Sequence, residues 1–106
     1  MQRRIQVSIG RIFIFLLFTY SSATKDVAAS DLAYGEYLAG ECVACHRPSS
    51  ESAIPPINAL PAPYFVEALR EYRDGERDHA LMRTVARSLA PPEMEALAAY
   101  FEQLEP

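Results

Sequence analysis

Two cysteines and a histidine stand at a spacing that has a specific chemistry. The run Cys42-Val43-Ala44-Cys45-His46 is a C-x-x-C-H motif, the sequence at which haem c is attached covalently through two thioether bonds. We expect this motif in the first turn of a helix, where residues three apart share one face and both sulfur atoms can reach one haem. His46 would then supply an axial nitrogen to the iron. The motif therefore predicts one covalent haem c and, with it, electron transfer.

Two other uses of the same residues fit the chain less well. A redox-active C-x-x-C site of the thioredoxin kind needs a βαβ pattern around it, and the sequence shows no strand runs rich in Val and Ile. A structural zinc ion needs four ligands. The chain offers such a set only if all four of these side chains come together at one point: Cys42, Cys45, His46 and the second histidine, His79. Haem attachment by Cys42 and Cys45 is therefore the preferred interpretation.

The N-terminal residues are typical of an export signal. A basic opening, Gln2-Arg3-Arg4, precedes an apolar run from Ile12 to Tyr20 and the small residues Ser21-Ser22-Ala23. An uncleaved membrane anchor is the alternative, but a span needs about 20 apolar residues and Arg11 interrupts the run. We therefore predict a signal peptide over 1–23, cleaved near Ala23 or alternatively near Ala28 or Ala29. The protein would be periplasmic, with a flexible start over 24–30 and a haem domain over 31–106.

The charge of the exported chain restricts its partners. Removal of the three signal arginines leaves seven basic residues against fourteen acidic ones, a formal charge of −7. No basic patch interleaved with aromatic residues is present, so nucleic acid is an unsuitable partner. The acidic surface is either simply solvated or attracts a basic face of a redox partner.

Helical periodicity and turn residues predict an all-α fold with no strand pairs, repeats or internal linker. A loop from Arg47 to Pro63 is dense in proline and serine and cannot be helical. Gly75 stands where a helix would end in left-handed geometry. The expected helices run from Ser30 or Asp31 to about Gly40, from about Pro63 to Asp74, briefly after Asp78, and from Pro91 over an apolar stripe that includes Phe101.

A haem that only transfers electrons usually has a second axial ligand, and three residues could provide it. Met82 and Met94 both lie on apolar helical stripes, so periodicity does not separate them, and either could be core filler. Met82 follows a turn at Gly75 that could fold the chain across the distal haem face, which favours it over Met94 and His79. A thioether ligand would raise the reduction potential relative to a second histidine.

The order of these features resembles a class I cytochrome c over about Leu32 to Leu104. The resemblance implies a small all-α fold wrapped around one haem, with His46 and Met82 as iron ligands. It also implies that the first and last helices cross closely, with Gly35 of one meeting Tyr100 of the other.

The segment from Ile54 to Arg77 is more specific, because it is similar to the monohaem cytochrome subunits of flavocytochrome c sulfide dehydrogenases. That resemblance implies a sulfide-oxidising flavoprotein as electron donor, and a hydrogen bond from His46 Nδ1 to the carbonyl of Pro55 or of the adjacent Pro56. Both prolines could instead simply stiffen the loop. The chain departs from the family pattern at Arg47, where glycine is common, and at Ala90, where a Ser or Thr cap is common.

The remaining expectations concern Arg77, His79 and the function of the whole chain. Arg77 either lies near a haem propionate or pairs at the surface with Glu76 or Asp78, and His79 faces solvent. The chain alone is expected to carry electrons and not to be an enzyme. The leading function is the haem subunit of a sulfide-oxidising flavocytochrome. The alternatives are a freely diffusing carrier serving an oxidase or another dehydrogenase, and a haem-based sensor or oxygen- or peroxide-reactive haem protein.

Overall fold

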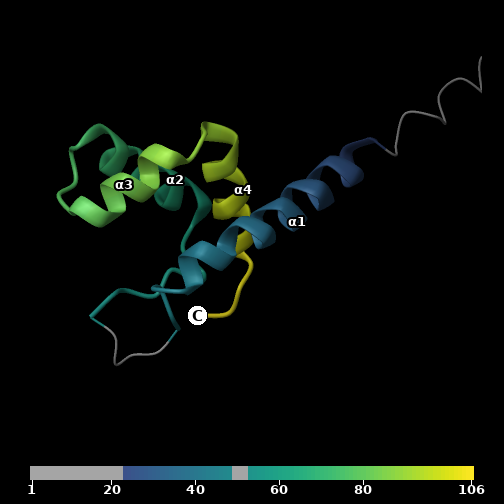
Figure 1. Ribbon diagram of the computed structural model, residues 1–106. Coiled ribbons are helices and arrows are strands. Elements are labelled where there is room, and N and C mark those ends of the chain that lie inside the picture. The colour runs from purple at the N-terminus through teal and green to yellow at the C-terminus, as the bar shows by residue number, and fades with distance from the viewer. Residues whose placement is uncertain (1–22, 49–52) are drawn as a thin grey trace, which may run out of the picture.

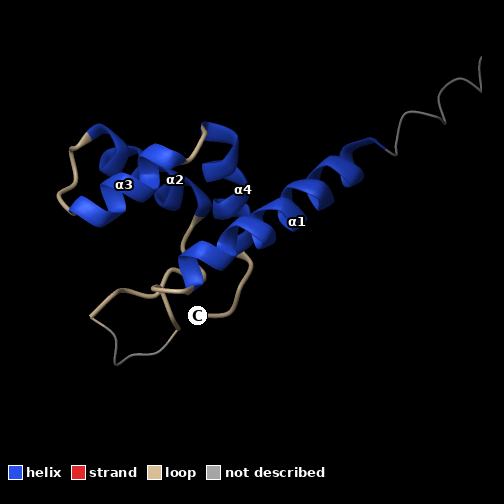
Figure 2. Ribbon diagram, in the orientation of Figure 1, coloured by secondary structure: helices blue, strands red, loops and turns tan. Residues whose placement is uncertain are grey.

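A computed structural model describes residues 23–48 and 53–106 of the chain. Within these residues the protein has four helices and no strand (Figure 2). The helices are α1 (Ala23–Val43), α2 (Ala62–Asp74), α3 (Ala80–Ser88) and α4 (Pro91–Glu102). The all-α prediction is confirmed. The predicted signal peptide and residues 49–52 of the proline-rich loop lie outside the described residues, apart from Ala23 at the proposed cleavage point.

The first helix is longer than its sequence signals indicated. It begins at Ala23, before the predicted caps Ser30 and Asp31, and it continues beyond Gly40 to Val43. Gly40 lowers helix stability by about 1 kcal/mol relative to alanine, but glycine alone does not end a helix. No proline occurs before Pro48. Figure 1 shows the N-terminal part of α1 projecting away from the other helices, while its C-terminal part crosses α4.

The crossing of α1 and α4 depends on one glycine. A Cβ atom at Gly35 would collide with the carbonyl oxygen of Ala96 and would come within 2.9 Å of the Cβ of Tyr100. The two helices can therefore approach this closely only because position 35 has no side chain. The expected contact between Gly35 and Tyr100 is confirmed.

The hydrophobic core lies between α2 and α4 and extends to α1. Met94, Leu97 and Phe101 of α4 are almost completely buried. Phe65 of α2 stacks on Phe101, with ring centroids 5.5 Å apart and the planes inclined by 19°. Ala39 of α1 and Ala86 of α3 are also buried members of this core.

The connection from α2 to α3 is a tight turn. Gly75 ends α2 with φ at 83°, and its amide donates to the carbonyl of Tyr72. Only glycine adopts this left-handed conformation without strain, so the position was correctly predicted from sequence. The helix that follows, α3, packs only against α2 among the described helices and buries a single residue, Ala86.

The loop before α2 is fastened to the end of α4. The amide of Ala59 donates to the carbonyl of Phe101 at 2.9 Å, and the Asn58 side chain donates to the carbonyl of Glu105 at 3.0 Å. The carboxylate of Glu102 accepts from the amide of Ala62 at 2.9 Å, which supplies a partner for the exposed start of α2. Ala59 has a positive φ of 58°, a conformation that strains any residue with a side chain. These contacts hold the second half of the loop in place.

The last helix starts without a side-chain cap from Ala90, as the sequence indicated. The carboxylate of Glu93 instead reaches back and accepts from the amide of Ala90 at 2.7 Å. Its other oxygen accepts from the hydroxyl of Tyr34 on α1 at 3.0 Å. This hydrogen bond raises the pKa of the Tyr34 phenol above its ordinary value, because the neutral hydroxyl donates to a carboxylate. Glu93 thus joins the start of α4 to α1.

Over the residues from 23 to 48 and from 53 to 106, no helix combines the length and the apolar character needed to cross a membrane.

Candidate haem site

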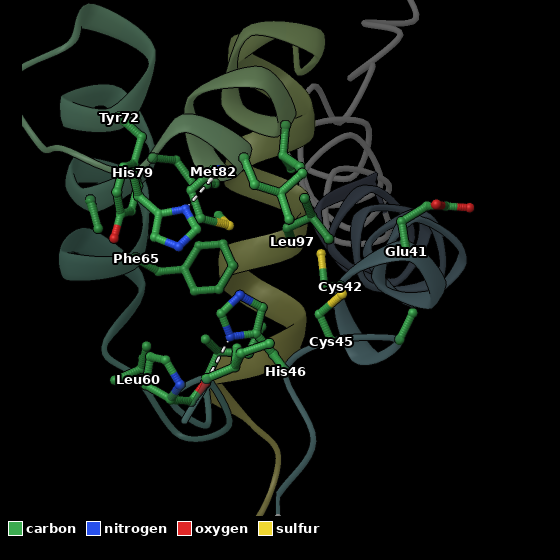
Figure 3. Close-up of a pocket in the computed structure, with 18 of the residues that line it drawn as sticks. Glu41, Cys42, Cys45, His46, Leu60, Phe65, Tyr72, His79, Met82 and Leu97 are labelled. Carbon is green, nitrogen blue, oxygen red and sulfur yellow. Dashed lines mark hydrogen bonds between the residues drawn. The ribbon is translucent and has the colours of Figure 1, made fainter. Parts of the chain in front are cut away.

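The C-x-x-C-H motif lies at the end of α1 and in the turn that follows it. Cys42 belongs to the last turn of the helix, and the amides of Cys45 and His46 both donate to the Cys42 carbonyl, at 3.2 and 2.8 Å. The expectation that the motif occupies the first turn of a helix is therefore wrong. The turn beyond α1 nevertheless keeps a helix-like hydrogen bond between residues four apart. Figure 3 shows the two sulfur atoms on the same side of the pocket.

His46 is held in one orientation by the loop. Its Nδ1 atom lies 2.7 Å from the carbonyl oxygen of Pro55. A carbonyl can only accept, so Nδ1 must be the donor and carry the ring proton. The other ring nitrogen, Nε2, is then left with its lone pair available. A backbone carbonyl that fixes the ring and its tautomer is the usual support of a metal-binding histidine. The residue predicted to accept this bond, Pro55, is the one in contact.

A cavity of about 520 Å³ opens beside the motif. This volume lies in the range of about 300–1,000 Å³ that is typical of cofactor sites. Each of the four described helices contributes to it: Cys42 from α1, Phe65 and Leu69 from α2, Met82 and Val85 from α3, and Leu97 from α4. Most of its walls are aliphatic or aromatic, as a large apolar macrocycle requires. The cavity therefore fits a haem in size, in lining and in the placement of the two cysteines.

The three candidates for the second axial ligand lie in different places. Met94 is fully buried in the core and does not line the cavity. Met82 is half-buried and lines it, opposite His46 in Figure 3. His79 also lines the cavity, but its Nδ1 atom accepts a hydrogen bond from the Met82 amide at 3.3 Å. The structure thus separates the two methionines, which periodicity could not do.

Arg77 pairs with neither of the two surface residues that the sequence suggested. Instead of pairing with Glu76 or Asp78, it binds Glu71 through Nη2 at 2.7 Å and through Nε at 2.9 Å. Its guanidinium also lies over the ring of Tyr72, 5.3 Å from the centroid. Interactions with Tyr64, Glu71 and Tyr72 raise the pKa of Arg77 above its ordinary value. The Gly75 turn brings these groups together, and of them Tyr72 reaches the cavity.

Within the described ranges, 23–48 and 53–106, the cysteine thiols do not belong to a cluster of metal ligands. Burial raises the pKa of the Cys42 thiol above its ordinary value, and the nearby charge of Glu41 raises it further. Among the described residues, no group of three or more His, Cys, Asp and Glu side chains gathers at a point where it could hold a metal ion. The described part of the chain therefore offers no support for the zinc interpretation.

The sequence matches the family model of cytochrome c over residues 32–105. It is 33% identical over 72 residues to a protein named "Thiosulfate dehydrogenase electron acceptor" from Thiomonas intermedia (strain K12), an alignment that covers 64% of this chain and 33% of that protein. It is 34% identical over 83 residues to "Cytochrome c-554(548)" from Halomonas halodenitrificans (strain ATCC 12084 / NCIMB 8669), covering 73% of this chain and all of that protein. With "Cytochrome c4" from Azotobacter vinelandii the identity is 30% over 71 residues, 59% of this chain and 34% of that protein.

The fold, the motif at the end of α1 and the family match together define a class I cytochrome c. The chain belongs to the cytochrome c family, and its single C-x-x-C-H motif binds one covalent haem c through Cys42 and Cys45. When bound, the haem supplies a one-electron redox centre, and electron transfer is the function of the family. The chain spans about a third of the length of the thiosulfate dehydrogenase electron acceptors that it matches.

Two features of the site were missed by sequence reasoning. His79 is exposed, as expected, but it also contacts the Met82 backbone. A histidine directly before a short amphipathic helix is compatible with a cap, and this was the available signal. The second missed feature is the attachment of the loop to α4 through Asn58 and Ala59, for which the sequence carries no local signal.

Proposed function

We propose that His46 and Met82 are the two axial ligands of the haem iron, with Cys42 and Cys45 as the covalent attachment points and Pro55 as the support of His46. The observation that carries this proposal is that the two methionines lie in different environments. Met82 faces the cavity opposite His46, whereas Met94 is enclosed by core side chains. The hydrogen bond between His46 and Pro55 supports it independently, because it leaves Nε2 free.

The protein residues have separate tasks in this arrangement. Pro55 fixes the His46 ring and strengthens its basicity by accepting the Nδ1 proton. The thioether of Met82 favours the reduced state of a haem iron relative to a second imidazole. Apolar side chains such as Phe65, Leu69 and Leu97 exclude water from the site. A filled coordination sphere changes little between oxidation states, which suits a carrier and not an enzyme acting on its own.

Carbon monoxide binding tests this ligand set and separates it from the sensor alternative. We expect the reduced wild-type protein not to bind carbon monoxide, because Met82 fills the sixth position. The Met82→Ala variant should bind it readily. Rapid binding by the wild type would contradict the proposal and support a ligand-sensing or oxygen-reactive haem protein with a vacant or labile site.

The second part of the proposal concerns the protein that donates electrons to the haem. We infer that this cytochrome is a haem subunit that accepts electrons from a sulfide-oxidising flavoprotein, which is what the segment from Ile54 to Arg77 resembles. The name of the relative from Thiomonas intermedia favours a second candidate, a thiosulfate dehydrogenase. Both donors oxidise an inorganic sulfur compound, so the two candidates differ in the enzyme and not in the direction of electron flow. A freely diffusing carrier serving another dehydrogenase or an oxidase is the remaining alternative.

Stoichiometric association and reduction kinetics distinguish these donors. The haem protein is purified from its native host at low salt, and any chain that co-purifies is analysed for flavin. A flavin-containing partner that reduces the cytochrome on addition of sulfide would support the leading candidate. Reduction that requires thiosulfate and a partner without flavin would support the second. Recovery as a monomer that neither enzyme reduces would contradict both and favour the diffusing carrier.

We propose a periplasmic location, because covalent haem attachment and the signal-like residues 1–23 belong to an exported protein. The N-terminal sequence of the haem-containing protein tests this. A mature start near Ala23, Ala28 or Ala29 is expected, and retention of Met1 in the haem-loaded protein would contradict cleavage.

A further inference from the structure

We propose that His79 positions Met82 by capping α3, the helix that carries it. This inference rests on the proposed function, because it gives His79 a role only if Met82 binds iron. It differs from the expectation that His79 is an uninvolved surface residue or a competing ligand. The contact that carries it is the hydrogen bond from the Met82 amide to His79 Nδ1, at 3.3 Å.

The backbone around His79 has the geometry of a helix cap. Its φ and ψ of −172° and 109° are extended, and its carbonyl already accepts the first helical hydrogen bond, from the Arg83 amide at 2.9 Å. Met82 is the third residue of the helix, where a capping side chain usually accepts the amide proton. The amide is the donor, so Nδ1 of His79 must be unprotonated and the neutral ring carries its proton on Nε2. An imidazole here replaces the usual Ser, Thr, Asp or Asn.

Helix α3 has few other contacts that could hold its first turn. It buries Ala86 only, and it packs against α2 alone among the described helices. Its first turn contains no acidic residue, and Leu81, just before Met82, is 59% exposed. The start of α4 is fixed by Glu93, and that of α2 by Glu102. His79 holds the start of α3 by accepting a hydrogen bond from the amide of Met82, the proposed iron ligand.

The consequence concerns how often Met82 leaves its position. Without a cap, the first turn of a short helix frays, and Met82 moves with it. Loss of a cap typically destabilises a helix by about 1 kcal/mol, which corresponds to about a fivefold larger open population. His79 thereby sets the fraction of molecules in which the sixth position is accessible to another ligand.

Binding of imidazole to the oxidised, haem-loaded protein measures this fraction, because its apparent affinity scales with the open population. We expect His79→Ala to raise the apparent affinity for imidazole about fivefold. His79→Phe keeps an aromatic ring in the cavity but has no acceptor, and it should behave like the alanine variant. Asparagine is a strong capping residue, so His79→Asn should return the affinity to within about twofold of the wild type. Thr84→Ala is the matched control: it removes the hydrogen bond that the Thr84 hydroxyl donates to the Ala80 carbonyl of the same helix, and it should not raise the affinity, because alanine favours the helix.

The outcomes separate this inference from the ligand assignment. Wild-type affinity in both His79→Ala and His79→Phe, or failure of His79→Asn to restore it, would overturn the capping role while leaving Met82 as the ligand. If the sulfur-to-iron charge-transfer band of the wild type survives in Met82→Leu, the ligand assignment itself is wrong, and the inference about His79 is overturned with it.

Discussion

Helices α3 and α4 line the same cavity but are held in very different ways. Helix α4 buries five residues, including Met94, Leu97 and Phe101, and it crosses α1 at close range. Helix α3 buries one residue and contacts only α2 among the described helices. The methionine in the firmly packed helix is enclosed in the core, and the methionine in the loosely packed helix faces the cavity. The proposed distal ligand, Met82, thus lies on α3, which is packed less extensively than α4.

The largest expected effect is on the free energy of unfolding, through the core residues of α4. Phe101 is fully buried and stacks on Phe65, so Phe101→Ala should lower the free energy of unfolding by about 3–5 kcal/mol. Tyr37, which is 80% exposed on α1, provides the control, and Tyr37→Ala should change it by less than about 0.5 kcal/mol. Denaturant unfolding of the haem-loaded proteins measures both. Equal effects would mean that the core described for α4 does not stabilise the protein.

The helix crossing offers a second test, with two glycines of the same helix. Gly35→Ala would force α1 away from Ala96 and Tyr100, and we expect a loss of about 1–3 kcal/mol in the free energy of unfolding. A Cβ atom at Gly40 would meet no other atom within 4 Å, so Gly40→Ala should stabilise α1 by about 0.5–1 kcal/mol. The two substitutions are chemically identical, and opposite signs are expected. Effects of the same sign would contradict the close crossing.

Hydrogen exchange compares the two helices directly. In the haem-loaded protein, the amides of Leu97 and Ala98 in α4 should exchange only through global unfolding, because their helix is buried. Removing the proposed ligand in Met82→Leu should accelerate exchange across α3 at least tenfold, which corresponds to a loss of about 1.4 kcal/mol of local stability, and should leave the α4 amides much less affected. Uniform acceleration in both helices would show that α3 is not a separately held unit.

The smallest expected effect lies in the loop that supports His46. Ala59 has a positive φ of 58°, and glycine adopts this conformation without steric strain. Ala59→Gly should therefore raise the free energy of unfolding by up to about 1 kcal/mol, while Ala59→Val should lower it. Thermal unfolding of the three proteins provides the measurement. A stabilising valine would contradict the left-handed conformation at this position.

Much of the site was predictable because its signals are local. The spacing of Cys42, Cys45 and His46 is a property of five consecutive residues, and the left-handed end of α2 needs only Gly75. The choice between Met82 and Met94 could not be made from periodicity, because each lies on an apolar stripe. Only the packing shows which stripe faces the core and which faces the cavity.

Other features depended on contacts between distant parts of the chain. Helix α1 passes through Gly40, since a glycine that meets no neighbour weakens a helix without ending it. The partner of Arg77 is Glu71, which the Gly75 turn brings close, and not Glu76 or Asp78, the turn neighbours that were one of the two alternatives for this residue. The contact of His79 with the Met82 amide depends on where α3 begins, and a sequence pattern places the ends of a helix less sharply than its centre.

The most direct test of the account is the sulfur-to-iron charge-transfer band of the oxidised, haem-loaded protein. Leucine has nearly the same volume as methionine but no sulfur, so Met82→Leu and Met94→Leu form a matched pair. The band should be present in the wild type, absent in Met82→Leu and retained in Met94→Leu. A band that survives in Met82→Leu, or that is lost only in Met94→Leu, would contradict the assignment of Met82 as the axial ligand.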